Sequence, residues 1–594
     1  MRNRTKNYKL MPSLLMAGAL LLAGCTNNDY DFDKVDLTMG FGGETLTIPS
    51  SSTTEIPLAD ILELKEDGSV TTDAEGNYLF SLNGQGDAAH PKVNPIELRG
   101  SSQNPNFQVD LQSDRGARAK RAAQSFSTEP LLVFEYHGNS PEVKSITEAD
   151  VTGFVTTIQL NLKSLKDIVP NIEELILTIP SYLQINSLNG NGNGTPNIMG
   201  NKIVVRNVTA ANDFKLTIKA NKLDFTQEQD EYGHLTIDKN TGKIDLEGYF
   251  SLAIKGTVTG LPTTSTYTIA SNISVSNMTV NSAKGKFDPD INLNNLGEVQ
   301  VKDIPDFLDD DNVVTDLDNP RIILTISNDM KVAAKVSGDL IALNKEGREI
   351  ARVQLPKMDI HRTTTNDAAT TNICICRHAT PELTSEYGND LYVVDNLSTL
   401  IQRIPDKIKF TNVEAKANQD VEAEFLFNHQ YNVNPSYKVE APLAFAENAN
   451  IVYKKSMNDW NDDVKDLDLA EGAYVELTTN VENKMPAYLN IEATPIDANG
   501  NSLADKLAIE IPNKVIAASA DGNTPANTNV TIKISPKTKQ ALKLLDGIEF
   551  VMSGSAATPG QTTITGITLN KNKHSLKLNN INIKIVGKVI GDFN

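Results

Sequence analysis

Apolar and polar residues alternate over most of the chain, which is the period of a β-strand with one buried face. In "GKIDLEGYFSLAIKG", from Gly242, the apolar side chains at even positions share one face, while Asp245 and Glu247 lie on the other. Turn signals such as "DAEG" from Asp73 and "DANG" from Asp497 separate these runs, because Gly and Asn accept the backbone angles of tight turns. The pattern predicts a mostly antiparallel β-protein.

Helical signals are few and recur in a fixed context. "NLKSLKDIVP" from Asn161 and "NLSTLIQRIP" from Asn396 share an Asn, two Leu residues three apart, a β-branched residue and a final Pro. The spacing predicts a short helix that the proline ends and whose leucines cap the core of a sandwich. "PKTKQALKLLDGIEF" from Pro536 predicts a third helix that leads into a strand.

A second repeated motif pairs "SNDMKV" around Asn328 with "ENKMPA" around Asn483, each followed by a strand, a Gly turn, another strand and a proline. These repeats indicate units of roughly 120–160 residues, the size of one sandwich domain. We therefore predict tandem antiparallel β-sandwich, immunoglobulin-like domains with a few short capping helices. The alternative is an elongated β-barrel or tubular lipid-binding fold, since long alternating strands also form those.

Amino-acid composition indicates what class of protein this is and which partners it is not expected to bind. The 594 residues have room for several domains, and a hydrophobic content of 39% is that of a globular protein. A net charge of -20 excludes nucleic acid as an expected partner, because phosphates would be repelled. With three cysteines, the chain has no disulfide framework, so large cores must hold the domains together.

The N-terminus has the order of a secretory signal: a basic head followed by an apolar stretch, residues 10–22, that is too short to span a bilayer. The segment Leu22-Ala23-Gly24-Cys25 resembles the lipobox of bacterial lipoproteins. The resemblance implies cleavage before Cys25, diacylglycerol on its sulfur and a further acyl chain, such as palmitate, on the new amine. Several acyl chains hold a protein at a membrane more firmly than one.

An acidic cluster follows the cysteine and resembles the surface-export signal of Bacteroidetes lipoproteins; its members are Asp29, Asp31, Asp33 and Asp36. The resemblance implies an outer-membrane lipoprotein at the cell surface. The alternative is a location on the periplasmic face, with the cluster acting as a solvated tether. No later stretch reaches eighteen apolar residues, so we expect the lipid to be the sole membrane anchor.

We predict six regions along the chain from these signals. They are a signal peptide at 1–24, the acylated cysteine and tether at 25–34, an N-terminal β region at 35–130, a sandwich with a short helix at 131–290, and two sandwich repeats at 291–430 and 431–594.

Signatures of common active sites are missing from the sequence, including HExxH, GxSxG, GxxxxGK[ST] and a helix-opening GxGxxG. We therefore expect a non-enzymatic protein without a cofactor, apart from calcium. Two acidic loops carry oxygen ligands at alternate positions, which suits Ca²⁺; the candidate ligands are Asp309, Asp311, Asp459 and Asp463. The second loop lacks the Gly and Glu of an EF-hand, and a solvated acidic loop is the alternative.

Trp460 is the sole tryptophan and lies among polar residues, which predicts a ring at the surface. With Asp459 and Asp462 beside it, the ring could stack on a sugar whose hydroxyls the carboxylates accept. An anchor that folds the loop onto its domain is the favoured interpretation. In "NICICRHA", Cys374, Cys376 and His378 would point to one side of a strand toward a soft metal, but ordinary strand cysteines are the favoured interpretation.

The basic segment "DRGARAKRAAQ" from Asp114 lies between strand-like segments of an acidic protein. It is similar to the site in Bacteroidetes fimbrial subunits where cleavage after an arginine releases an assembly strand, and Arg118 or Arg121 would serve here. A solvated loop is the alternative.

Together these features predict a lipid-anchored envelope lipoprotein whose sandwiches bind a glycan or an envelope protein. The alternatives are a fimbria-like structural or assembly subunit and an enzyme with a dispersed active site.

Overall fold

The computed structural model describes residues 45–49, 52–62, 69–110, 123–259, 266–293, 296–301, 313–461, 467–469, 471–587 and 589–591. Strands make up 57% of the structure, and the helices of these residues are two short α-helices and several 3-10 turns. Nearly all strand pairs are antiparallel, which confirms the predicted mostly-β sandwich fold.

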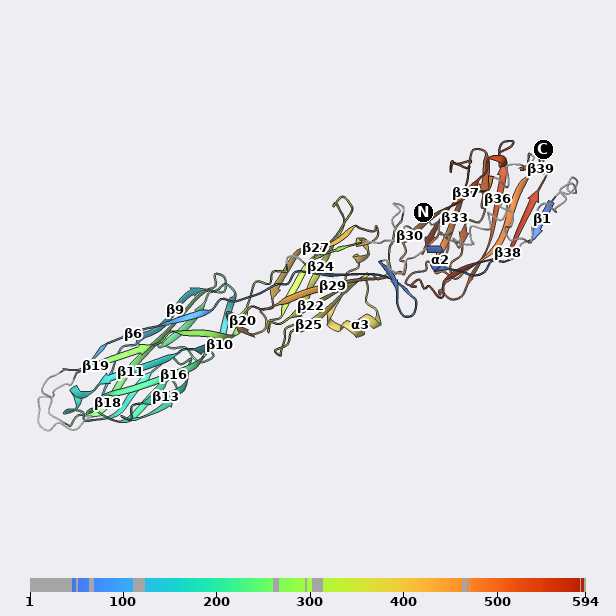
Figure 1. The fold of residues 1–594 in the computed structure, drawn as a ribbon. Coiled ribbons are helices and arrows are strands. Elements are labelled where there is room, and N and C mark those ends of the chain that lie inside the picture. The colour runs from blue at the N-terminus through green and yellow to red at the C-terminus, as the bar shows by residue number, and fades with distance from the viewer. Residues whose placement is uncertain are drawn as a thin grey trace, which may run out of the picture.

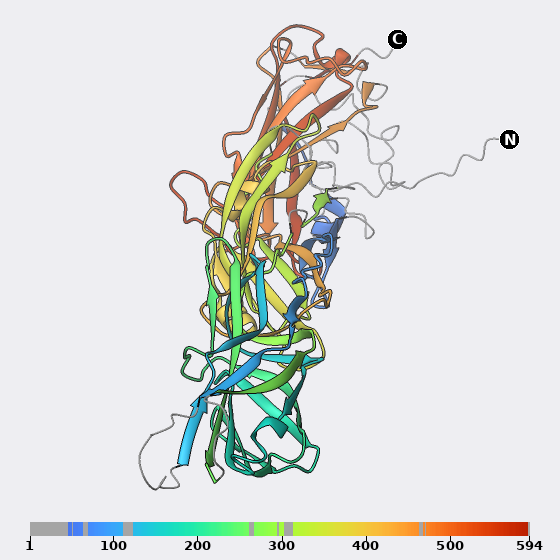
Figure 2. The ribbon, with the colours of Figure 1, turned by 90° about the vertical axis from the view of Figure 1, so that its left-hand side faces the viewer.

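Three sandwiches follow one another in a rod (Figures 1 and 2). We name them by their positions. The distal sandwich comprises residues 96–287 and 423–426, the middle sandwich residues 70–85, 298–417 and 433–442, and the C-terminal sandwich residues 45–62 and 450–591.

The distal sandwich joins seventeen strands into one network whose two layers meet where β5 pairs with β9. The first layer contains β5 (Ile96–Gly100), β6 (Ser102–Gln103), β7 (Asn106–Asp110), β10 (Val143–Thr152), β11 (Val155–Asn161), β13 (Leu183–Gly190), β16 (Phe214–Asp224), β19 (Thr266–Val275), β20 (Met278–Phe287) and β28 (Ala423–Leu426). The second contains β8 (Ala123–Ser127), β9 (Leu131–Asn139), β12 (Asn171–Thr178), β14 (Thr195–Met199), β15 (Lys202–Thr209), β17 (Gly233–Ile237) and β18 (Lys243–Thr257).

The middle sandwich packs a six-stranded sheet on a four-stranded one. The first has the order β26 (Leu391–Val393), β25 (Ala369–Cys376), β22 (Arg321–Asn328), β29 (Val433–Pro442), β4 (Tyr78–Gln85) and β3 (Val70–Thr72), with β25 and β26 parallel. The second has the order β21 (Glu298–Gln300), β27 (Lys407–Ala417), β23 (Ala334–Leu343) and β24 (Glu349–Ile360). Helix α3 (Pro381–Tyr387) and the turn η5 (Gly388–Asp390) connect β25 to β26.

The C-terminal sandwich repeats this arrangement. One sheet has the order β1 (Thr45–Pro49), β38 (Ser575–Val586), β32 (Tyr474–Asn483), β36 (Ala526–Pro536) and β34 (Leu507–Glu510), with β2 (Ile56–Pro57) also on β38. The other has the order β30 (Asn450–Met457), β37 (Gly547–Ser555), β33 (Tyr488–Ile496) and β35 (Val515–Ile516). Helix α2 (Leu58–Leu62) follows β2, and β31 (Leu467–Leu469) pairs with β39 (Val589–Gly591).

The sandwiches are nested along the chain, so the predicted domain boundaries are wrong. The region 35–130 is not a unit of its own: β1 pairs with β38, β4 with β29, and β7 with β19, so its strands enter all three sandwiches. The boundary at 430 also fails, because β28 pairs with β20 of the distal sandwich while β29 lies between β22 and β4 of the middle one. Local sequence patterns define strands but not their partners.

The repeated leucine motifs form single 3-10 turns instead of longer helices. They are η3 (Lys163–Leu165), η6 (Leu397–Leu400) and η7 (Leu542–Leu544). Their leucines are nevertheless buried, as at Leu165, Leu400 and Leu542. Each turn therefore buries its leucines in the hydrophobic core, and one turn of chain is enough to place them.

The alternating pattern of β18 buries the predicted face. Ile244, Leu246 and Phe250 are all buried, and the chain bulges between Gly248 and Tyr249. Gly248 is required here, because a Cβ at this position would lie 2.2 Å from the ring of Phe134. Phe134 in turn packs edge-on against Phe154, with 5.9 Å between ring centroids, and so joins the two layers of the distal core.

The "SNDMKV" motif forms a buried corner after β22. The Asn328 side chain, fully buried, donates from Nδ2 to the carbonyl oxygens of Val332 at 3.3 Å and His361 at 2.9 Å. Its Oδ1 accepts the backbone N–H of Met330 at 3.0 Å. One amide thus joins the end of β22, the start of β23 and the end of β24.

The "ENKMPA" motif forms the same corner after β32. Asn483, also fully buried, donates to the carbonyl oxygens of Ala487 at 3.1 Å and Ala517 at 2.9 Å. Its Oδ1 accepts the N–H of Met485 at 2.8 Å. The shared sequence motif therefore marks a shared structural element of the middle and C-terminal sandwiches.

Candidate functional site

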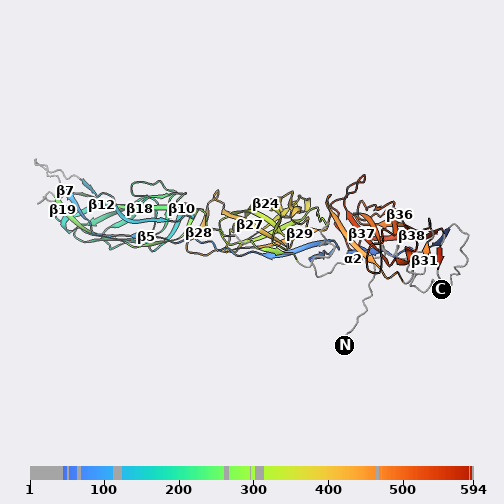
Figure 3. The same ribbon diagram turned by 90° about the horizontal axis from the view of Figure 1, so that it is seen from above.

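A cavity opens between the two layers of the distal sandwich. Strands β7 and β19, which border it, lie at the end of the rod farthest from the C-terminal sandwich (Figure 3). The volume of the cavity is about 310 Å³. Strands β7 and β8 border it from opposite layers, and β18 and β19 complete its walls. It lies where the two layers separate, which leaves part of the core accessible.

The cavity combines an apolar floor with a polar rim. Leu252, Ile254 and Ile269 are buried beneath it, and Phe107 and Phe126 are half-buried at its sides. The polar residues Asn106, Gln108, Ser127 and Thr128 also border it.

Alternation along the bordering strands produces this mixed character. On β7, Phe107 and Val109 face inward while Asn106 and Gln108 are exposed. On the opposite layer, the Thr128 hydroxyl accepts the backbone N–H of Leu252 at 2.9 Å, which ties the end of β8 to β18. Aromatic faces beside amides and hydroxyls are the groups that hold sugars or short peptides. Sequence reasoning missed this cavity, because its residues come from four separate strands and form no motif.

A charged cluster lies on the outer face of the same sandwich, where β9, β17 and β18 pair. His137 contacts Asp245 through Nδ1 at 2.9 Å and Glu135 through Nε2 at 3.4 Å. The hydrogen bond to Asp245 is the main cause that raises the pKa of His137. Although His234 and Glu247 lie nearby, no group of three or more ligating side chains in the described part of the chain is placed to hold a metal ion.

The prediction of a surface ring at Trp460 is wrong. The side chain is 3% exposed and belongs to the core of the C-terminal sandwich. The backbone N–H of Trp460 donates to the carbonyl of Asp546 at 2.9 Å, and the Asp546 carboxylate accepts the N–H groups of Asp459 at 3.2 Å and Asn461 at 3.1 Å. These bonds fold the acidic loop onto the turn before β37, so the ring is an anchor.

Of the other predicted ligands of this loop, one lies within the described residues. Asp459 is exposed, while Asp462 and Asp463 lie outside the described residues, as do Asp309 and Asp311 of the first acidic loop. Cys25, Arg118 and Arg121 also lie outside the described residues. The calcium, acylation and cleavage assignments therefore remain predictions.

Cys374 and Cys376 are buried free thiols that pack with Leu383 of α3. A hydrogen bond between the thiols and burial raise the pKa of Cys374. His378 is directed elsewhere, with Nε2 3.4 Å from Asp318. The pair thus fills the space between β25 and α3, in accord with the favoured interpretation as ordinary strand cysteines.

No known protein family matches the sequence, and no curated protein matches it. Among solved structures, a candidate secreted protein of Parabacteroides distasonis ATCC 8503 aligns with 18% identity and a TM-score of 0.33, covering 51% of this chain and 83% of its own. A structure of Sulfolobus turreted icosahedral virus aligns with 8% identity and a TM-score of 0.11, covering 83% and 92%. These TM-scores are too low to support a conclusion about fold or function.

Among the described residues, no helix is both long and apolar enough to cross a membrane.

Proposed function

We propose that this protein is a non-enzymatic, lipid-anchored envelope lipoprotein that holds its distal sandwich away from the membrane to bind a glycan or a protein partner. The lipobox at Cys25 motivates the anchor. The observation that supports the proposal best is that the first described strand and the candidate cavity lie at opposite ends of the molecule. Strand β1, twenty residues after Cys25, lies at the outer end of the C-terminal sandwich, and the candidate cavity lies at the opposite end of the rod (Figures 1 and 3).

The nested topology supports this role. Strands β1 to β7 lie along the rod and belong to all three sandwiches. A tether at the N-terminus would therefore leave the distal sandwich as the part farthest from the membrane. Binding sites on the ends of rigid strands are common, because the strands fix the positions of the residues they present.

The anchor is tested by replacing Cys25 with serine and fractionating the cells. The wild-type protein should sediment with outer membranes, while C25S should be released into the soluble fraction, because a hydroxyl does not take the thioether-linked lipid. Retention of C25S in the membrane pellet would contradict the anchor. Protease treatment of intact cells, followed by immunodetection, separates surface display from the periplasmic alternative.

The binding role is tested on an array of glycans and by capture of envelope proteins. Gln108→Ala, at the rim of the distal cavity, should lower binding at least tenfold. Gln159→Ala is the matched control, because Gln159 is exposed on β11 of the same sandwich and does not line the cavity. If both variants bind as the wild type does, the cavity is not the binding site.

A fimbria-like subunit is the second candidate. Strands β1 to β7 all precede the segment with Arg118 and Arg121 and supply strands to sheets of all three sandwiches. Loss of such strands would expose unpaired edges, which other chains can fill. Sequencing the N-terminus of mature protein decides this: a start at Ala122 supports assembly, and an acylated Cys25 rejects it.

A further inference from the structure

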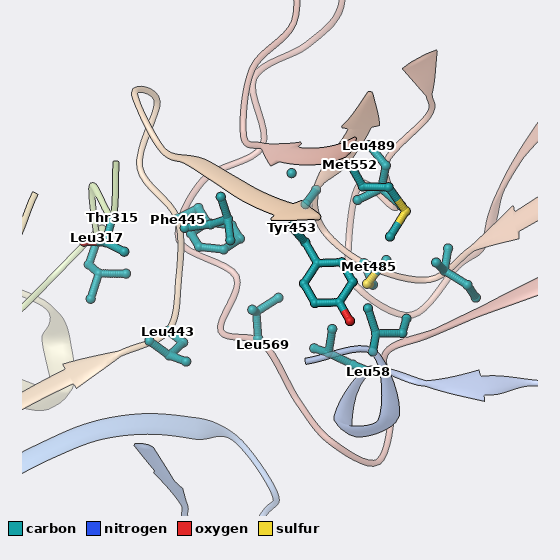
Figure 4. Close-up of a pocket in the computed structure, with 15 residues that line it drawn as sticks. Leu58, Thr315, Leu317, Leu443, Phe445, Tyr453, Met485, Leu489, Met552 and Leu569 are labelled. Carbon is teal, nitrogen blue, oxygen red and sulfur yellow. The ribbon is translucent and has the colours of Figure 1, made fainter. Parts of the chain in front are cut away.

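A second cavity lies where the C-terminal sandwich meets the middle one (Figure 4). Its volume is about 90 Å³, and it is partly open to solvent. Its walls come from α2, from residues 315–317 and 443–445 at the joint, from β30, β33, β37 and β38, and from the turns around Met485 and Leu569.

The lining is almost entirely apolar. Apart from the hydroxyls of Thr315 and Tyr453, its side chains carry no nitrogen or oxygen atom. The Thr315 hydroxyl already donates to the carbonyl of Ile401. A water molecule needs two to four polar partners to be stable inside a protein, so water is a poor occupant of this space.

Small residues keep the space open. Gly554 lies near the end of β37, between β30 and β33, and lines the cavity. A Cβ at Gly554 would have its closest contact at 3.8 Å, with Leu489, so the position has room for a side chain. Glycine within a strand is unfavourable, because it loses more backbone entropy and packs nothing. The sequence thus contains a destabilising residue where it creates volume.

The corresponding corner of the middle sandwich carries a larger side chain, Val332, where the C-terminal sandwich has Ala487. There the Asn328 motif places Met330 and Val332 in the closed core. In the C-terminal sandwich, Met485 and Ala487 occupy the same places and line the cavity. Valine has two carbon atoms that alanine lacks, so the side-chain volume at this corner differs between the two sandwiches.

We propose that this cavity binds the aliphatic end of a lipid or fatty acid. Its volume of about 90 Å³ has room for the last few methylene groups of an aliphatic chain and not for a folded partner. Met485 and Met552 project into it (Figure 4), and methionine side chains adapt to flexible apolar ligands. The polar end of the ligand would remain at the opening.

The inference is tested with the fluorescent polyene fatty acid cis-parinaric acid and the whole chain carrying C25S, which keeps the protein free of its own lipid. We expect saturable binding with one site per chain. Gly554→Val should weaken binding at least tenfold while the melting temperature stays equal or rises, because valine fills the space. Gly190→Val is the matched control: Gly190 is exposed at the end of β13, with no atom closer than 3.8 Å to an added Cβ, and should bind normally.

Ala487→Val provides a second filled variant, since valine is the residue at the matching corner of the middle sandwich, and it should also weaken binding. The proposal is overturned if the unmodified cavity shows no saturable binding. It is also overturned if the folded filled variants bind as tightly as the Gly190→Val control. Because the lipid anchor is absent throughout, neither result depends on whether the anchor or the distal binding role is correct.

Discussion

The middle and C-terminal sandwiches share a backbone corner but differ in the side chains that pack beside it. In both, a buried asparagine joins three strand ends through matching hydrogen bonds. The strand that ends at this asparagine lies between two neighbours in each sheet: β22 between β25 and β29, and β32 between β36 and β38. In the middle sandwich the next residues, Met330 and Val332, are closed into the core. In the C-terminal one, Met485 and Ala487 line a cavity.

This difference separates two properties of one fold. The hydrogen bonds of the corner involve backbone partners and one side chain, so they persist while neighbouring side chains change in volume. Side-chain volume then decides whether the corner is solid or hollow, since protein interiors otherwise leave few voids. The same corner can therefore serve as a rigid spacer in one sandwich and as a binding chamber in the next.

The largest expected effect comes from removing the corner itself. Asn328→Ala leaves three backbone groups, most of them buried, without their partner, as does Asn483→Ala. Each change should lower the unfolding free energy of its own sandwich by about 3 kcal/mol. Hydrogen exchange resolved by peptide would show which sandwich opens. A loss confined to one of the two variants would mean that the corners are not energetically equivalent.

A smaller change in unfolding free energy is expected from exchanging Val332 and Ala487, which occupy the same place in the two corners. Val332→Ala should create a void in the middle sandwich and lower its stability by about 2 kcal/mol. Ala487→Val should fill space in the C-terminal sandwich and raise its stability by about 1 kcal/mol. Thermal unfolding followed by calorimetry measures both. Opposite signs would support the solid and hollow corners, whereas destabilisation by Ala487→Val would indicate that the cavity has no free room.

Low pH should lower the stability of the C-terminal sandwich through a buried histidine. His574, buried in the C-terminal one, accepts the backbone N–H of Asn570 through Nδ1 at 2.9 Å. Burial lowers the pKa of His574 from 6.5 to about 4. The unfolded chain therefore binds the proton first, and stability should fall between pH 6.5 and pH 4 by up to about 1.4 kcal/mol per pH unit.

Chemical unfolding at a series of pH values checks this, with His574→Gln as the comparison. The variant should have a flatter pH dependence in that range, because glutamine does not titrate. An unchanged slope would assign the acid sensitivity to other groups.

The smallest effects are expected at the surface ion pairs beside the two corners. Lys331 contacts Glu424 at 2.6 Å and Lys484 contacts Glu55 at 2.7 Å, with the four side chains partly or largely exposed. Lys331→Ala and Lys484→Ala should each change stability by less than about 1 kcal/mol, since water and salt screen exposed pairs. A larger loss at Lys484 would show that its bond to Glu55 is needed to hold the N-terminal segment.

The sequence was informative where structure is local. Alternation at Ile244, Leu246 and Phe250 predicted a buried strand face. The two asparagine motifs predicted a repeated unit, and the structure shows that they share a corner. The sequence was uninformative where partners are distant. The sequence neighbours of Trp460 are polar, so they gave no sign that its ring is buried. The carboxylate of Asp546, which accepts a hydrogen bond from the backbone beside Trp460, is far away in sequence.

The cavities were missed for the same reason, although one signal was present. Aligning "NDMKV" with "NKMPA" places Ala487 opposite Val332, and the pattern of β37 contains Gly554 within an otherwise well-packed strand. A loss of volume at one position of a repeat, together with a glycine within a strand, is a detectable sign of a chamber. No comparable sign exists for the distal cavity, because its walls have no repeated counterpart.

The pairing of Thr45 with Val586 has a consequence for the order of assembly during synthesis. Strand β1 emerges first, yet its partner β38 is among the last segments made, so the two ends must find each other across nearly the whole chain. The entropic cost of closing such a loop grows with its length, and prior folding of the intervening sandwiches would shorten it. The distal sandwich should therefore fold before the C-terminal sandwich. Strand β1, although it is synthesised before the other described strands, should be among the last to pair.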